Sequence, residues 1–91
     1  MKSNVELIRE AKNDLKVSLG QTDWMILMNT EGRDIKLGRS PFLLTHHIKT
    51  KRWTARILGL NIETDQWPSA SEAYIQLRLL VQKISELKLQ I

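Results

Sequence analysis

The sequence predicts a small α+β domain, a two-layer sandwich in which an N-terminal helix and a longer C-terminal helix cover one face of an antiparallel sheet of three to four strands. Helix-start signals occur near each end of the chain, and the segments between them alternate between polar and apolar residues. The length of 91 residues fits a single domain over residues 1–91, and no repeat or linker-like tract divides it.

The N-terminal helix is expected over residues 4–19. Ser3 and Glu6 have the spacing of a capping box, in which the two side chains satisfy free backbone amides reciprocally. Gly20 follows as a natural terminator. The apolar residues of this segment recur on one helical face, which we expect to be buried: Ile8, Ala11, Leu15 and Leu19.

A central strand is expected at residues 24–28, where Trp-Met-Ile-Leu-Met forms a short and continuous apolar run. Gly32 follows in a turn signal because glycine can adopt positive φ. Residues 33–37 then alternate between polar and apolar. We therefore expect these two runs to pair as an antiparallel hairpin.

Two further strands are expected at residues 42–48 and 52–60. The second alternates most clearly, so Trp53 is expected to face the core while the polar residues of that strand face the opposite side. Residues 62–67 are expected to form a short additional strand or an extended loop.

The C-terminal helix is expected from Ala70 to about Gln90, because Ser69 and Glu72 repeat the capping-box spacing. Its apolar stripe consists of Ala73, Leu77, Leu80, Ile84 and Leu87, widened by Tyr74 and Val81.

Three more apolar residues of this helix lie off that stripe: Ile75, Leu79 and Leu89. They predict either a surface for a homodimer through the C-terminal helix or a surface that the first helix covers within the chain.

Composition restricts the class of protein. Cysteine is absent, which excludes disulfides and cysteine-ligated metals and fits a reducing compartment. No apolar segment resembles a signal peptide or a membrane span, so we expect a cytoplasmic protein with no membrane partner.

The sequence carries no pattern that indicates an enzyme. The four glycines are too far apart to form a phosphate-binding loop, and no serine lies in a G-x-S-x-G elbow. Glu63 and Asp65 share a strand face, but such a pair is commoner on an exposed strand than in an acid–base site. His46 and His47 point to opposite faces of a strand and so do not chelate one metal. We expect no catalytic residue, metal or other cofactor.

Positive charge is concentrated in the middle of the chain. The net charge is +4, yet residues 33–56 alone carry seven cationic side chains against the single carboxylate of Asp34. A localised basic segment between nearly neutral flanks is typical of a surface that binds a polyanion. The candidate nucleic-acid-binding residues are Arg33, Lys36, Arg39, Lys49, Lys51, Arg52, Thr54 and Arg56.

Two functions follow from this surface. The first is a small non-enzymatic protein that binds DNA or RNA through a basic exposed sheet face and a hairpin tip at Lys49, Lys51 and Arg52. The alternative is a protein-interaction module, an adaptor or inhibitor, that binds an acidic protein partner or self-associates through its C-terminal helix.

Two known kinds of domain share parts of this pattern. The order helix, three strands, helix over about residues 4–88 is similar to the double-stranded-RNA-binding domain, but residues 69–73 lack the lysines that open the second helix there. The stretch from Lys51-Arg52-Trp53-Thr54-Ala55-Arg56 to Trp67-Pro68-Ser69-Ala70-Ser71-Glu72-Ala73 resembles the three-stranded DNA-binding modules of recombinase arms and plant transcription factors. That resemblance implies a DNA-facing strand carrying Arg52, Thr54 and Arg56. Neither resemblance identifies a family.

Overall fold

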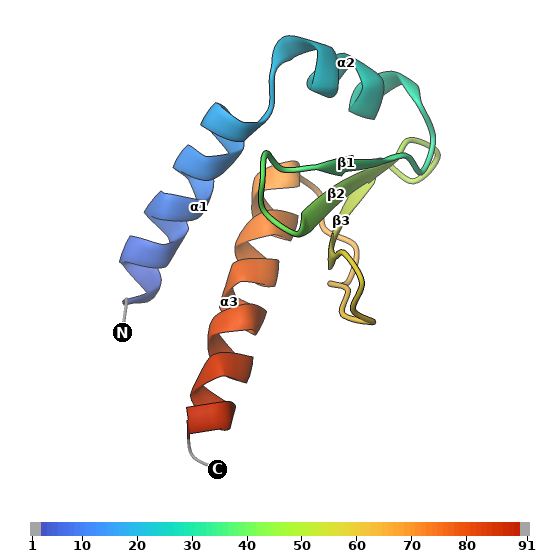
Figure 1. Cartoon of the computed structure of the whole chain (residues 1–91). Coiled ribbons are helices and arrows are strands. Elements are labelled where there is room, and N and C mark those ends of the chain that lie inside the picture. The colour runs from blue at the N-terminus through green and yellow to red at the C-terminus, as the bar shows by residue number, and fades with distance from the viewer. Residues whose placement is uncertain (1–2, 90–91) are drawn as a thin grey trace.

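The computed structural model describes residues 3–89 and confirms a small α+β fold, with three helices and one antiparallel sheet in this part of the chain (Figure 1). The sheet order is β1-β2-β3, so each strand pairs with its neighbour in the sequence. No helix in this part of the chain is both long and apolar enough to cross a membrane. The elements are α1 (Asn4–Ser18), α2 (Gln21–Asn29), β1 (Asp34–Lys36), β2 (Phe42–His47), β3 (Arg52–Ile57) and α3 (Ala70–Leu89).

Helix α1 confirms the predicted N-terminal helix. The Ser3 hydroxyl accepts a hydrogen bond from the backbone N–H of Glu6 at 3.2 Å, which satisfies one free amide of the first turn. Ile8, expected on the buried face, is only half-buried. The inward-facing side of the helix is centred closer to Leu7, which is buried in its place. The buried residues are Leu7, Ala11, Leu15 and, just beyond the helix, Leu19.

The strand predicted at residues 24–28 is wrong, because these residues lie within helix α2. The Asp23 carboxylate accepts a hydrogen bond from the Gly20 N–H at 3.1 Å and so closes the first turn of this helix. A short apolar run has no periodicity that distinguishes a buried strand from a buried helix. The hydrogen bond that Asp23 makes at the start of this run favours the helix. The expected hairpin between residues 24–28 and 33–37 is therefore also wrong, and β1 pairs with β2 instead.

Helix α2 covers one end of the sheet. Leu27 is fully buried, and its carbonyl lies 3.0 Å from Nδ1 of His46 on β2. The indole of Trp24 packs edge-on against that of Trp53, with 6.1 Å between ring centroids. The apolar run predicted as a central strand thus contributes to the core as a helix.

Strands β2 and β3 confirm the two strands expected at residues 42–48 and 52–60, and they pair antiparallel over six residues each. Strand β3 is shorter than expected because the chain turns back at Gly59. The φ of Gly59 is +80°, a conformation that residues with a side chain rarely adopt.

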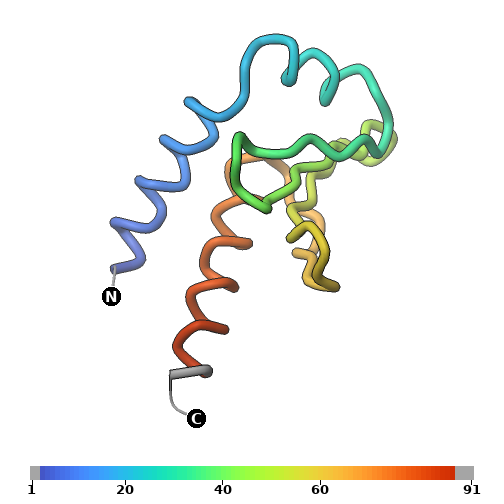
Figure 2. Tube along the Cα trace, in the orientation of Figure 1, coloured from blue at the N-terminus to red at the C-terminus, as the bar shows by residue number. Residues whose placement is uncertain are grey.

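Residues 62–67 run antiparallel along the outer edge of β3 as an extended segment, and they then lead back to the start of α3 (Figure 2). The segment is bridged to β3 at Glu63 and at Trp67. Between these bridges it holds one residue more than β3, so the ladder contains a bulge. At the bulge, the Thr64 hydroxyl accepts a hydrogen bond from the Ala55 N–H at 3.0 Å.

The core lies between the sheet and the helices, which occupy one face of it. Helix α3 packs on β2 and β3, and α1 runs alongside α3 in the opposite direction (Figure 1). The core cluster includes Ala11 and Leu15 of α1, Leu27 of α2, Leu44, Trp53 and Ala55 of the sheet, and Ala73, Tyr74 and Leu77 of α3.

Helix α3 confirms the predicted C-terminal helix through Leu89, although Gln90 and the side chain of Leu89 lie outside the described part of the structure. Burial decreases along its apolar stripe. Leu77 is fully buried, whereas Leu87 is 54% exposed, because the C-terminal half of the helix extends beyond the sheet (Figure 1). Ile75, one of the residues off the stripe, packs against the core.

Candidate nucleic-acid interface

The face of the sheet opposite the helices, which we call the open face, carries half of the predicted basic site. The strand register places Lys36 and Arg56 on either side of Leu43, in one row across the three strands. Arg52 and Thr54 share the open face with Arg56 because alternate residues of a strand point to the same side.

The guanidinium of Arg56 is already paired on the open face. It forms an ion pair with the carboxylate of Asp34, which also accepts a hydrogen bond from the Thr45 hydroxyl. The two charged side chains are 39% and 36% exposed, respectively. Within the described residues, Nε of Arg56 is buried without a hydrogen-bond partner. The pairing reduces the charge that Arg56 offers to an anionic ligand.

Thr54 lies on the open face but is only 4% exposed. Its hydroxyl is 3.0 Å from Nε2 of His47 on the neighbouring strand, so the two side chains are hydrogen-bonded. Thr54 therefore orients His47 and is not itself accessible to a large ligand.

The turn between β2 and β3 presents the hairpin tip of Lys49, Lys51 and Arg52, all of which are exposed. Lys51 adopts the left-handed conformation, with φ of +58°, and its N–H donates to the Ile48 carbonyl at 3.3 Å. A tight turn of this kind holds the cationic residues close together in the chain and away from the core.

Arg33 lies at the same end of the sheet as the hairpin tip, because the N–H of the preceding Gly32 donates to the carbonyl of His46 near the end of β2. Glu31 is at this end as well, and its carboxylate accepts a hydrogen bond from the Ile48 N–H at 2.6 Å. The sequence analysis did not anticipate that contact. It anchors the turn and adds one negative charge beside the four cations.

Arg39 lies apart from the other predicted residues. It belongs to the turn between β1 and β2, at the opposite end of the strands from the hairpin tip. There it lines a cavity of about 430 Å³ on the helical side of the sheet, together with Asp14, Ser18, Tyr74 and Arg78. The structure therefore brings Arg33, Lys49, Lys51 and Arg52 together at one end, places Lys36 and Arg56 further along the open face, and separates Arg39 from both groups.

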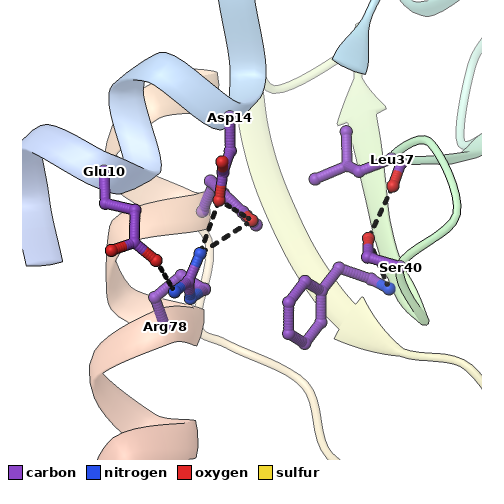
Figure 3. Close-up of polar contacts among 7 residues, drawn as sticks. Glu10, Asp14, Leu37, Ser40 and Arg78 are labelled. Carbon is purple, nitrogen blue, oxygen red and sulfur yellow. Dashed lines mark hydrogen bonds and ion pairs between the residues drawn. The ribbon is translucent and has the colours of Figure 1, made fainter. Parts of the chain in front are cut away.

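A second polar cluster joins α1 to α3 (Figure 3). Arg78 bonds with Nη2 to the Glu10 carboxylate at 2.8 Å and with Nη1 to the Asp14 carboxylate at 2.6 Å. The Tyr74 hydroxyl donates to Asp14 at 3.2 Å. Sequence analysis missed this cluster, although both helices carried its signal: the two acids are four residues apart on one helix, and the tyrosine and arginine four apart on the other.

Burial and hydrogen bonding shift two pKa values in this cluster. Desolvation by burial raises the pKa of the Tyr74 phenol above 10.0, and the cation of Arg78 offsets only part of that rise. For Arg78, burial lowers the pKa, but the hydrogen bonds with Glu10, Tyr74 and Asp14 outweigh it and raise the pKa above its ordinary value. The cluster is a structural link, since both carboxylates are used to hold one arginine.

The two adjacent histidines point to opposite faces of β2. His46 is buried and stacks on Trp53, with 4.0 Å between ring centroids, whereas His47 lies on the open face. Within residues 3–89, no group of three or more His, Cys, Asp or Glu side chains is placed to hold a metal ion.

No protein-family model matches this chain, and no curated protein or solved structure shows significant similarity to it.

Proposed function

We propose that this chain is a small non-enzymatic nucleic-acid-binding protein whose ligand lies across the hairpin tip and along the open face of the sheet. One observation carries the proposal: five exposed cations of this region have no acidic partner in the described part of the chain. They are Arg33, Lys36, Lys49, Lys51 and Arg52.

The chemistry of such a surface suits phosphates. Lysine and arginine at the hairpin tip neutralise backbone phosphates and release condensed counterions, which supplies affinity without reading bases. Arg52 has the planar fork that binds two phosphate oxygens at once. Arg56 contributes less because Asp34 holds it, and Arg39 and Thr54 are not included in the proposed interface.

Salt dependence tests the proposal. With about four phosphates engaged, the logarithm of the binding constant for duplex DNA is expected to fall against the logarithm of salt concentration with a slope near −3.6. Fluorescence anisotropy with labelled duplex DNA, RNA and heparin measures this slope and shows which polyanion is preferred. Binding that is insensitive to salt, or absent at low salt, contradicts the proposal.

A variant locates the interface. Changing Lys49, Lys51 and Arg52 together to glutamine removes three phosphate contacts, so the slope is expected to move about three units toward zero. A control variant with the same loss of charge changes Arg9, Lys12 and Lys16, which lie on the exposed side of α1, to glutamine. Equal effects of the two variants would show that net charge, and not the hairpin tip, determines binding.

Self-association is the second candidate function, favoured by the exposure of Leu87 on the apolar stripe of α3. An adaptor that presents the hairpin tip to an acidic protein remains the alternative use of the same cations. We also propose a cytoplasmic location, for which the absence of cysteine is the support.

A further inference from the structure

A groove separates the extended segment at residues 62–67 from α3, on the opposite edge of the sheet from β1. We call it the edge groove. Its volume is about 340 Å³, which suits the side chains of a bound segment. Its wall and rim residues are Glu63, Asp65, Trp67, Leu79, Leu80 and Lys83.

The backbone beside the groove is an open sheet edge. The Ile62 carbonyl accepts a hydrogen bond from Ile57 at 3.1 Å, and the Thr64 N–H donates to Ala55 at 2.9 Å, both toward β3. The peptide groups of Glu63 lie between these two bonds and therefore point away from β3. Within the described residues, neither of them has a hydrogen-bond partner. An open edge of this kind accepts an added strand.

The side chains of the groove indicate the chemistry of that strand. Leu79 and Leu80 are only partly buried, and with Trp67 they offer apolar surface to side chains entering from the edge. Glu63 and Asp65 are exposed on the segment itself, and no ion pair involves either of them within the described part of the chain. These two carboxylates outnumber Lys83, the one cationic residue of the lining, and therefore favour a cation where the added strand would lie.

We propose that the edge groove binds an extended peptide by strand addition, with apolar side chains two residues apart over Leu79 and Leu80 and a lysine or arginine beside Glu63 and Asp65. Backbone hydrogen bonds to Glu63 give the peptide its direction, and the groove selects alternate side chains because a strand presents every second residue to one side. This proposal does not rest on the proposed nucleic-acid interface: Glu63 is bridged to Arg56, which Asp34 already holds, whereas the unpaired cations of that interface lie at the hairpin tip, at Arg33 and at Lys36.

Titration of the full-length protein with a designed peptide tests the proposal. The probe is the heptapeptide TTVKVTT, acetylated and amidated, in which two valines two residues apart point to one side of the strand and the central lysine points to the other, the side that Glu63 shares with its bridge partner Arg56. In ¹H–¹⁵N correlation spectra, the peptide is expected to shift the amide resonances of Glu63, Asp65 and Leu79. Shifts confined to the hairpin tip, or no shift in the groove at millimolar peptide, overturn the proposal.

Two matched peptides separate the contributions. TTVEVTT places a carboxylate beside Glu63 and Asp65 and is expected to bind at least tenfold more weakly. A TTVKVTT peptide methylated on alternate backbone nitrogens cannot donate to the edge and is also expected to lose binding. Equal binding of the lysine and glutamate peptides, or retained binding of the methylated one, overturns the proposal.

Variants of the protein complete the test. Changing Glu63 to glutamine and Asp65 to asparagine is expected to weaken the binding of TTVKVTT about 3- to 10-fold. The control changes Glu6 and Glu86, which lie outside the groove, to glutamine with the same loss of charge and is expected to leave binding unchanged. If groove resonances shift with protein concentration alone, a second copy occupies the groove and the peptide proposal is wrong.

Discussion

At the scale of single residues, pairing decides what a charged side chain is available to do. Arg56 and Arg78 were equivalent cations in the sequence, yet each is held by carboxylates in the structure, Arg56 by Asp34 and Arg78 by Glu10 and Asp14. The cations of the hairpin tip have no such partner in the described residues and remain available to a ligand.

Arg78 is expected to contribute substantially to stability. The change Arg78→Met keeps an unbranched apolar stem but removes the guanidinium that Glu10 and Asp14 share. We expect the free energy of unfolding in urea to fall by about 1–3 kcal/mol. The control Arg9→Met removes an exposed cation from α1 and is expected to change it by less than about 0.5 kcal/mol. An equal effect of the two changes would show that the cluster adds no stability.

The raised pKa of Tyr74 predicts that the folded protein loses stability at alkaline pH. Burial raises its pKa in the folded protein, so above pH 10 the unfolded chain releases a proton that the folded protein retains. Stability is therefore expected to fall as the pH rises above 10. Because Tyr74 is the only tyrosine, absorbance at the phenolate band follows its ionisation directly, and a midpoint at or below 10 contradicts the prediction. Tyr74→Phe is expected to reduce the alkaline loss relative to the unchanged protein.

At the scale of elements, caps and turns fix boundaries that hydrophobic patterns leave open. Ser3 and Ser69 lie at the starts of α1 and α3, and both helices form where the capping-box spacing predicts them. Helix α2 also begins at a capping interaction, in which the Asp23 carboxylate accepts a hydrogen bond from the Gly20 N–H, although its apolar run resembles a strand. Gly59 ends β3 earlier than its alternation suggests, because the turn requires positive φ.

The hydrogen bond between Asp23 and Gly20 at the start of α2 is expected to contribute measurably to the stability of the fold. Asp23→Ala removes the acceptor of the Gly20 N–H and is expected to lower the free energy of unfolding by about 0.5–1.5 kcal/mol. Asp23→Asn keeps an acceptor oxygen and is expected to lose less. Urea titration followed by tryptophan fluorescence measures both variants, and an alanine variant as stable as the asparagine variant would show that the cap is unimportant.

At the scale of the whole molecule, the two candidate binding surfaces lie on different elements, one on the sheet and one on helix α3. The molecule is elongated, 43 Å by 24 Å by 23 Å, because α1 and α3 extend beyond the small sheet (Figure 1). The basic region is on the sheet, whereas the exposed end of the apolar stripe is on α3. Binding of a polyanion and self-association can therefore be tested separately.

Leu87 provides the test of self-association. If α3 forms a homodimer, sedimentation is expected to show a dimer that dissociates on dilution from about 500 µM, and Leu87→Glu is expected to give a monomer. Ser85→Glu introduces the same charge at an exposed position on another side of the helix and serves as the control. A wild-type protein that stays monomeric at the highest concentration rules out this dimer.

Most of the fold was predictable because its signals are local. Capping spacing and periodicity located α1 and α3, and alternation located β2 and β3, since the hydrogen bonds and burial of those elements involve residues close in the sequence. Helix α2 was not predictable in the same way. A run of five apolar residues is compatible with either state, and its helical state depends on the hydrogen bond of Asp23 with Gly20 together with the packing of Leu27 and Trp24 against the sheet.

The sequence by itself determined the α+β class, both terminal helices, all three strands and the concentration of cations in the middle third of the chain. The tertiary structure decided which cations are available, because ion pairs and burial join residues far apart in the sequence: Asp34 with Arg56, Glu10 and Asp14 with Arg78, and His47 with Thr54. It also decided that Arg39 lies apart from the hairpin tip, because an antiparallel sheet places successive turns at opposite ends of its strands.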